Sequence, residues 1–228
     1  MHIKHFTFNA FQERSFLVWD DDCNCAFIDP GFLDASEEER LTSFVAAKGL
    51  KPVCIMLTHA HFDHIYGVSR LADSYGIPVY MHPAEKHTLE VTNPYLCKMF
   101  GLPEPAAFEW NPIQEAGEGG SVNGQDAVHV GSLKFEVLDT PGHTPGGVCF
   151  LERTENVMLS GDTLFAGAIG RTDHPGGDYD LLMKSIFEKL ICLEGKVEVL
   201  PGHGPDTSIA DESMTNPFLL PFNQPLED

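Results

Sequence analysis

Short segments of apolar residues, separated by polar turns, run through most of the chain. Near the N-terminus, the segments around 2–8, 14–20 and 24–29 are rich in Phe, Val, Ile and Trp, which predicts three strands. The run 53–57 is continuously apolar, as expected of a strand that is buried on both faces. Further strands are predicted at 79–82, 127–131, 133–138, 147–152, 157–160 and 196–200.

Helical periodicity separates these strands. Ser36 and Glu39 form a capping box, which predicts that a helix begins with Ser36 as its N-cap and ends at Gly49. Other helical segments are predicted at 65–75, 84–99 and 178–191. Strands cluster before and after the helices, which favours an α/β chain with two sheets face to face and helices outside, a four-layer αβ/βα sandwich. No repeat or linker interrupts the pattern, so we expect a single domain over 1–228.

Composition narrows the range of partners. The 228 residues include 14 Lys and Arg against 34 Asp and Glu, a net charge of −20, which argues against nucleic acid and anionic membranes. No apolar run reaches the roughly 18 residues of a membrane span, and no signal-peptide core is seen. Six scattered cysteines without a C-x-x-C motif predict free thiols in a reducing compartment. We therefore expect a cytoplasmic protein that acts on a small molecule, and the oligomeric state stays open.

The segment directly after the apolar run 53–57 holds four residues of metal-ligand type: His59, His61, Asp63 and His64. On a helix, His59 and Asp63 would share a face, but His61 would point about 200° away. An extended loop instead lets His59 and His61 project the same way, with Asp63 and His64 at the turn into the next helix. Neutral imidazoles and a carboxylate, without thiolates, suit zinc, iron or manganese.

Three later segments place a potential ligand beside glycine where a predicted strand ends. They are Pro-Gly-His around His143, Gly-Asp around Asp162 and Pro-Gly-His-Gly around His203. Glycine permits the sharp backbone turn that such a placement needs. Together the four segments offer seven ligands, which divide into two sites of three with one shared carboxylate.

The motifs T-H-x-H-x-D-H, P-G-H-T-x-G, G-D and P-G-H-G resemble those of the metallo-β-lactamase superfamily, and the resemblance spans nearly the whole chain. It implies the αβ/βα sandwich with two divalent metal ions at one edge between the sheets, zinc foremost, with iron or manganese as alternatives. By motif position, His59, His61 and His143 would hold the first metal, Asp63, His64 and His203 the second, and Asp162 would bridge them.

Finer motifs resemble the short bacterial form of the glyoxalase II-like hydroxyacylglutathione hydrolases. These motifs are G-D-T-L-F at 161–165, G-R-T-D at 170–173, P-G-G-D at 175–178 and N-P-F-L at 216–219. The longer enzymes of that group hold glutathione with basic residues of a C-terminal helical domain, whereas this chain ends 25 residues after His203. The resemblance implies a thioesterase for an anionic, S-lactoylglutathione-like substrate whose glutathione contacts come from elsewhere in the chain.

The expected chemistry is metal-dependent hydrolysis. Two neighbouring divalent cations lower the pKa of a water between them, and the hypothesis is that this bridging hydroxide attacks a thioester carbonyl. Asp63 is expected to orient the hydroxide as well as to bind a metal. Arg171 is a candidate for binding a substrate carboxylate, although an internal pair between Arg171 and Asp173 is the interpretation we favour. The segment 95–120 is expected to form a wall over the site, and His174 to be a solvated surface residue.

Other functions are compatible with the same residues. The persulfide dioxygenases share the fold and use one iron, for which His59, His143 and Asp162 would supply two imidazoles and a carboxylate. The complete second set of ligands, and the P-G-G after R-T-D, favour the hydrolase. Lactonase or β-lactamase activity would use the same metals with a different pocket shape. A metal-binding protein without catalysis is disfavoured, because seven ligands shared by two metals leave room for water.

Overall fold

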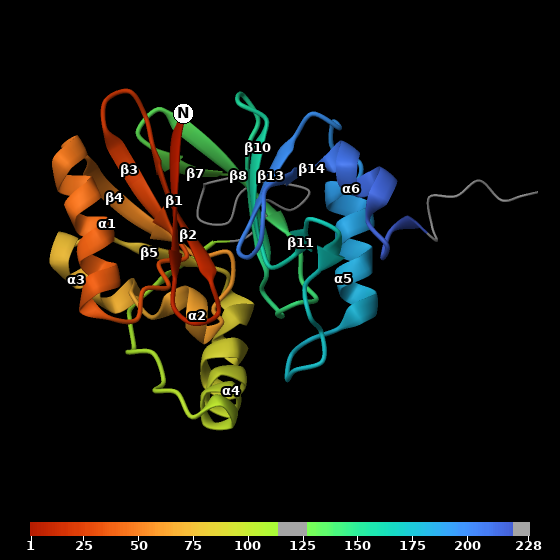
Figure 1. Ribbon diagram of the computed structural model, residues 1–228, viewed down its shortest axis with the longest axis horizontal. Helices are drawn as coiled ribbons and strands as arrows, with labels where there is room; N and C mark the ends of the chain where they lie inside the picture. The colour runs from red at the N-terminus through yellow and green to blue at the C-terminus, as the bar shows by residue number, and fades with distance from the viewer. Residues whose placement is uncertain (114–126, 221–228) are drawn as a thin grey trace, which may run out of the picture.

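The computed structural model describes residues 1–113 and 127–220. Two six-stranded sheets lie face to face in the centre of the molecule, and helices cover their outer faces (Figure 1). This arrangement is the four-layer αβ/βα sandwich that the sequence predicts. Within the described ranges, no helix has the length and apolar content needed to cross a bilayer.

The first sheet is built by the N-terminal half, with its strands side by side in chain order. They are β1 (His2–Phe8), β2 (Glu13–Trp19), β3 (Asn24–Ile28), β4 (Lys51–Met56), β5 (Val79–Met81) and β6 (Asn111–Pro112). Strands β1 to β3 pair antiparallel, and β3 to β6 pair parallel. Helices α1 (Ala35–Lys48) and α3 (Val68–Tyr75) cover the outer face of this sheet, and the short α2 (Phe62–Ile65) lies at its lower edge (Figure 1).

The second sheet has the order β14-β13-β10-β9-β8-β7. Its strands are β7 (Ala127–Val130), β8 (Leu133–Asp139), β9 (Val148–Glu152), β10 (Val157–Gly161), β13 (Glu198–Pro201) and β14 (Thr207–Ser208). The pair β10–β13 is parallel and the other pairs are antiparallel. Helix α5 (Tyr179–Ser185), the π-helical turn Ile186–Leu190 and α6 (Ile209–Thr215) cover its outer face, and β11 (Leu164–Phe165) and β12 (Ala168–Ile169) form a small hairpin.

The run 53–57, most of which lies in β4, is continuously apolar because both faces of the sheet are covered there. Cys54 and Met56 face the second sheet, whereas Ile55 and the following Leu57 face the layer of helices, and all four are buried. Three cysteines of the strands, Cys25, Cys54 and Cys149, are likewise buried between the layers. All six cysteines of the chain are free thiols.

The first helix begins two residues earlier than predicted. Asp34, not Ser36, is the N-cap, because its carboxylate accepts hydrogen bonds from the backbone N–H groups of Ser36 and Glu37 at 2.8 and 2.9 Å. Glu37, at the third helical position, accepts from the N–H of Leu33, the residue before the N-cap, at 2.7 Å. The same carboxylate also accepts from the N–H of Asn9 at 2.6 Å, and this tertiary contact favours the earlier start of the helix.

Two predicted helices are broken into shorter pieces. The segment 65–75 contains the end of α2 and all of α3, with Gly67 between them. A Cβ on Gly67 would lie 2.3 Å from the ring of Phe32, so close packing against that ring requires glycine there. The segment 84–99 contains a 3-10 turn (Pro83–Glu85), a π-helical turn (Thr88–Thr92) and α4 (Asn93–Phe100), which projects below the sandwich (Figure 1).

Candidate metal centre

The seven predicted ligands come from loops at one edge of the two sheets. His59 follows β4, His61 is the N-cap of α2, and Asp63 and His64 lie in the first turn of α2. From the second sheet, His143 lies in the loop after β8, Asp162 follows β10, and His203 follows β13. Strands that run in the same direction through a sheet end at the same edge. Residues that follow such strands therefore meet there although they are far apart in sequence.

The structure brings these ligands together in two groups. In the first, one ligand atom from each of His59, His61 and His143 lies within 4.8 Å of the others, and Nδ1 of His61 is 2.9 Å from Nε2 of His143. In the second, the same holds for Asp63, His64 and His203. There the two Nε2 atoms are 3.2 Å apart, and Nε2 of His203 is 3.5 Å from Oδ2 of Asp63.

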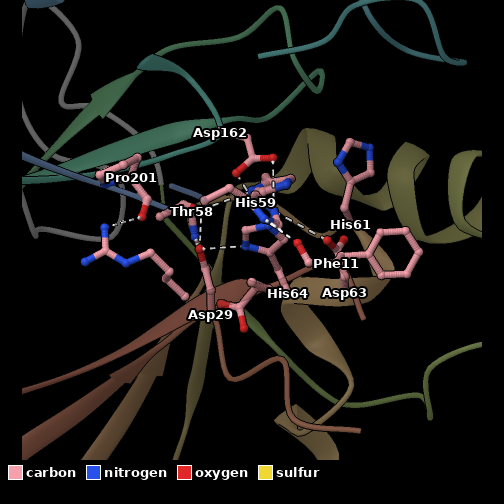
Figure 2. A network of polar contacts seen from close by, with 12 residues as sticks. Phe11, Asp29, Thr58, His59, His61, Asp63, His64, Asp162 and Pro201 are labelled. Carbon is pink, nitrogen blue, oxygen red and sulfur yellow. Dashed lines mark hydrogen bonds and ion pairs between the residues drawn. The ribbon is translucent and has the colours of Figure 1, made fainter. Parts of the chain in front are cut away.

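Asp162 lies between the two groups (Figure 2). Its Oδ1 is 3.5 Å from Nε2 of His64 in the second group, and its Oδ2 is 3.5 Å from Nε2 of His143 in the first. Oδ2 is also 3.7 Å from Nε2 of His203. This is the position that a carboxylate shared between two cations requires.

The residues present fit two divalent cations. Nε2 of His59 is buried without a hydrogen-bond partner, and Oδ1 of Asp162 makes only the long contact to His64. Buried polar atoms are rarely left unsatisfied, and cations held between the two groups would satisfy both. Imidazole nitrogens and carboxylate oxygens without thiolate are a donor set for zinc, iron or manganese.

Gly202, beside His203, keeps space open at the second group. A Cβ at this position would lie 2.5 Å from Oδ1 of Asp162 and 2.7 Å from Cε1 of His64. Any side chain larger than hydrogen would therefore press on two ligands at once. The glycine of this Pro-Gly-His segment therefore allows Asp162 and His64 to lie where they do.

Backbone carbonyls and a hydroxyl fix the orientation of three ligand imidazoles. Nδ1 of His143 donates to the carbonyl of Arg171 at 2.7 Å, and Nδ1 of His203 donates to the carbonyl of Phe11 at 3.1 Å. Nδ1 of His59 is 3.1 Å from the hydroxyl of Thr58. With Nδ1 engaged, each Nε2 presents its lone pair to the centre, as metal ligation requires.

Asp29, which the sequence analysis did not single out, supports the centre from the first sheet. Its Oδ1 accepts from the N–H of Thr58 at 2.7 Å, and its Oδ2 accepts from the Thr58 hydroxyl at 2.5 Å. The same Oδ2 is 3.2 Å from Nδ1 of His64 (Figure 2). One buried carboxylate thus orients a ligand of each group. The sequence signal was Asp-Pro-Gly at the end of the predicted strand 24–29, the same strand-end placement as the ligands.

Glu85 was also missed. Its buried carboxylate accepts from the N–H of Ala60, between two ligands, at 2.7 Å and from the N–H of Gly146, near His143, at 2.8 Å. The side-chain amide of Asn93 donates to the carbonyl of Ala60 at 2.8 Å, so both backbone polar groups of Ala60 are held. Burial raises the pKa of Glu85. No sequence signal distinguishes Glu85 from a surface acid, because it lies in a polar helical stretch.

The two groups differ in charge. Burial lowers the pKa values of His59 and His61 well below the usual range and that of His143 to about 4, so these imidazoles are neutral at pH 7. Burial also disfavours the charged form of His64 and His203, but nearby carboxylates, foremost Asp162, outweigh it and raise both pKa values. The negative field of these carboxylates favours a cation at the second group.

The remaining candidates lie at the rim. Arg171 is exposed, and its guanidinium pairs with both carboxylate oxygens of Asp173 at 2.9 Å, the internal pair favoured from sequence. The prediction of a solvated His174 is wrong for its Nε2 atom, which is buried. The ring of His174 stands edge-on to those of His61 and His143, with centroids 4.7 and 5.1 Å away, because the turn 174–177 folds over the ligands.

A cavity of about 140 Å³ opens beside the ligands. Its polar lining residues are His61, Asp63, His143, Asp162, Arg171 and His174. Its apolar lining residues are Phe11, Phe62, Leu96, Met99 and Phe100. The predicted wall over 95–120 is therefore present in its α4 part, whereas Phe108 and Trp110 line a different cavity and 114–120 lies outside the described residues.

Comparison with known proteins agrees with this geometry. Residues 9–207 match the family described as the Metallo-beta-lactamase superfamily. The chain is 37% identical over 222 residues to the hydroxyacylglutathione hydrolase GloC of Haemophilus influenzae, covering 96% of this chain and 98% of that protein. It is 38% identical over 208 residues to the probable metallo-hydrolase YqgX of Bacillus subtilis, covering 91% and 92%. Among solved structures, it is 36% identical to BLEG-1, a B3 metallo-beta-lactamase (TM-score 0.84, covering 96% and 99%), and to TTHA1623 in a di-iron-bound form (TM-score 0.80, covering 95% and 100%).

Proposed function

Because the chain belongs to the metallo-beta-lactamase superfamily and is a metal-dependent hydrolase of that kind, we propose that it cleaves thioesters, with acylglutathiones such as S-lactoylglutathione as substrates. The observation that carries the proposal is the pair of His/Asp groups with Asp162 between them, a site built for two cations. Similarity to GloC over nearly the full length of both proteins supports thioesters as the substrate class.

Each group has its own part in this proposal. His59, His61 and His143 would hold one cation, the second group would hold the other, and Asp162 would bind both. Two such cations supply a water of lowered pKa and polarise a carbonyl oxygen. Asp63 lines the cavity and stays ionised, because the neighbouring imidazoles of His64 and His203 lower its pKa against the effect of burial. Its free lone pairs orient the attacking water toward the substrate.

The reaction consumes one water and one thioester. The water oxygen forms a bond to the carbonyl carbon and the carbon–sulfur bond breaks. Of the two water protons, one ends on the departing sulfur and the other is released to solvent, so the products are a carboxylate, a thiol and a proton. Because a thiol has a pKa of roughly 8.5, the sulfur leaves as a thiolate without a dedicated proton donor. Arg171 at the cavity rim is the candidate for the substrate's carboxylate, although it would have to exchange its pair with Asp173.

The test combines metal content with thiol release. Protein purified without added metal is analysed for zinc, iron and manganese per chain, and cleavage of S-lactoylglutathione is followed with a thiol reagent. We expect about two metal ions per chain and metal-dependent thiol release. His203→Ala is expected to lose one ion and the activity, whereas His129→Ala, an exposed histidine of β7, keeps both. A two-metal protein that releases no thiol would refute the proposal.

β-Lactam hydrolysis is a second candidate, favoured by the 36% identity to BLEG-1. It is tested in parallel by the loss of absorbance of a chromogenic β-lactam. A persulfide dioxygenase is less well supported. The second group of ligands has no role in a one-iron reaction.

A further inference from the structure

We infer that the cavity beside the metal centre seats an apolar acyl substituent of phenyl or branched-alkyl size on the carbonyl carbon of the substrate. This inference rests on the proposed thioester hydrolysis and names the kind of thioester that the site selects. The apolar wall (Phe11, Phe62, Leu96, Met99 and Phe100) carries it.

Aromatic rings form the part of the wall nearest to α2. The centroid of the Phe11 ring is 5.1 Å from that of Phe62 and 5.4 Å from that of Phe100, and the Phe62 and Phe100 centroids are 6.1 Å apart. The three rings come from the turn after β1, from α2 and from α4. Rings fixed against one another in this way form a rigid surface that can pack on a flat or branched apolar group.

Met99 and Phe100 remain exposed beside these rings, with 54% and 46% of their surfaces accessible. Large exposed apolar side chains that adjoin a polar catalytic cavity are typical of a ligand contact. A methionine is well suited to this place, because its unbranched thioether adapts to groups of different shape. Covering this surface with an apolar part of the substrate would remove it from water.

The wall lies within reach of the reacting carbonyl. The cavity that it lines is also lined by Asp63, Asp162 and the imidazoles of His61 and His143, from both ligand groups. A carbonyl placed against the metal centre therefore has one of its two substituents beside the wall. In a thioester these substituents are the acyl group and the sulfur.

The volume of the cavity indicates that the acyl group of the thioester, and not its thiol portion, lies against the wall. The cavity measures about 140 Å³, close to the roughly 150 Å³ of an apolar protein cavity that binds benzene. Part of this volume adjoins the ligand residues and receives the carbonyl group, and the rest has room for a phenyl or branched-alkyl substituent, whereas a tripeptide thiol such as glutathione does not fit into it. The thiol portion would leave through the open side of the cavity.

Charge agrees with this assignment. Among the described residues that line the cavity, Arg171 is the one Lys or Arg, and both its contacts go to Asp173. The five residues of the apolar wall carry no charge that could bind a charged or strongly polar acyl group. Selection among acyl groups is therefore expected to follow apolar surface.

Two glutathione thioesters that differ in one substituent test the inference with the metal-loaded enzyme. The lactoyl thioester has a methyl group where the mandeloyl thioester has a phenyl group. We expect kcat/KM to be at least about tenfold higher for the mandeloyl thioester, as a pocket that gains several buried carbons predicts. Met99→Gln, which keeps the side-chain length, and Phe100→Ala are expected to lower this ratio. Tyr95→Ala, also on α4 and 53% exposed but outside the cavity, serves as the matched control.

Binding of the two acid products separates the inference from the proposed function. Calorimetry should show tighter binding of mandelate than of lactate to the metal-loaded protein, with the difference reduced in Met99→Gln. Thiol release without preference for the phenyl group, or a ratio unchanged in both wall variants, overturns the inference and leaves thioester hydrolysis standing. Tighter mandelate binding without cleavage of either thioester overturns the proposed function and leaves the apolar pocket standing.

Discussion

Glu85 holds two ligand loops together although it binds no metal itself, and the variant Glu85→Gln isolates this role. The carboxylate accepts one backbone N–H from the loop of His59 and His61 and one from the loop of His143. Glutamine keeps the shape of the side chain but has only one oxygen. Its NH₂ group must then face the N–H of either Ala60 or Gly146.

The magnitude follows from that contact. One hydrogen bond to a charged acceptor is lost and one buried N–H is left without an acceptor, which costs about 1–3 kcal/mol. Both N–H groups adjoin ligands of the first group, so the loss concerns the spacing of His59, His61 and His143. Changes to residues that orient ligands lower metal affinity by roughly 10–100-fold. We expect a decrease of that size for one of the two cations and little change for the other.

Competition with a chromophoric chelator measures the two affinities, and urea unfolding of the metal-free protein measures stability. Glu152→Gln is the matched control, because Glu152 is likewise buried and accepts a backbone N–H, that of Glu155, at 2.7 Å. The control keeps its single N–H contact through the remaining oxygen and is expected to keep its stability and both affinities. If Glu85→Gln loses stability but keeps both affinities, then Glu85 does not position the ligands and the reasoning fails.

Three further predictions follow from the same contacts. Gly202→Ala should lower the metal content toward one ion per chain, because its Cβ would press on Asp162 and His64; metal analysis showing two tightly bound ions would contradict this. Burial opposes ionisation of Asp20, but hydrogen bonds, foremost from Asn24, lower its pKa to about 2. The stabilisation from Asp20 is present above pH 4 and is lost as the pH falls toward 2, so urea unfolding of metal-free Asp20→Asn should show a flatter loss over this range. Chelation should lower the thermal midpoint of unfolding, and an unchanged midpoint in calorimetry would argue against a metal bound only by the folded state.

The ligands could be predicted from the sequence because metal binding restricts residue type. His, Asp and their glycine neighbours at strand ends are rare enough in combination that His59, His143 and His203 could be grouped without a structure. The resemblance of the motifs to the metallo-β-lactamase superfamily implied that the ligands lie at one edge between the sheets. The structure then showed which nitrogen of each imidazole faces the centre.

The residues that orient the ligands could not be predicted in the same way. Asp29 and Glu85 are ordinary acids in sequence, and their roles depend on which loops pack beside them. The N-cap of α1 illustrates the same limit, since Asp34 and Ser36 are both suitable N-cap residues and the tertiary contact between Asn9 and Glu37 favours Asp34. The wall of the cavity likewise depends on where α4 projects.

The burial of the cysteines has a consequence for the proposed thioesterase function. Burial raises the pKa values of Cys25 and Cys54 to about 12 and that of Cys149 to about 11, so these sulfurs stay protonated at neutral pH. Transfer of an acyl group from a thioester to a protein sulfur needs an accessible thiolate. The sandwich interior thus shields these side chains from acylation by the substrate, and the exposed Cys192 is the position at which such self-modification should be sought.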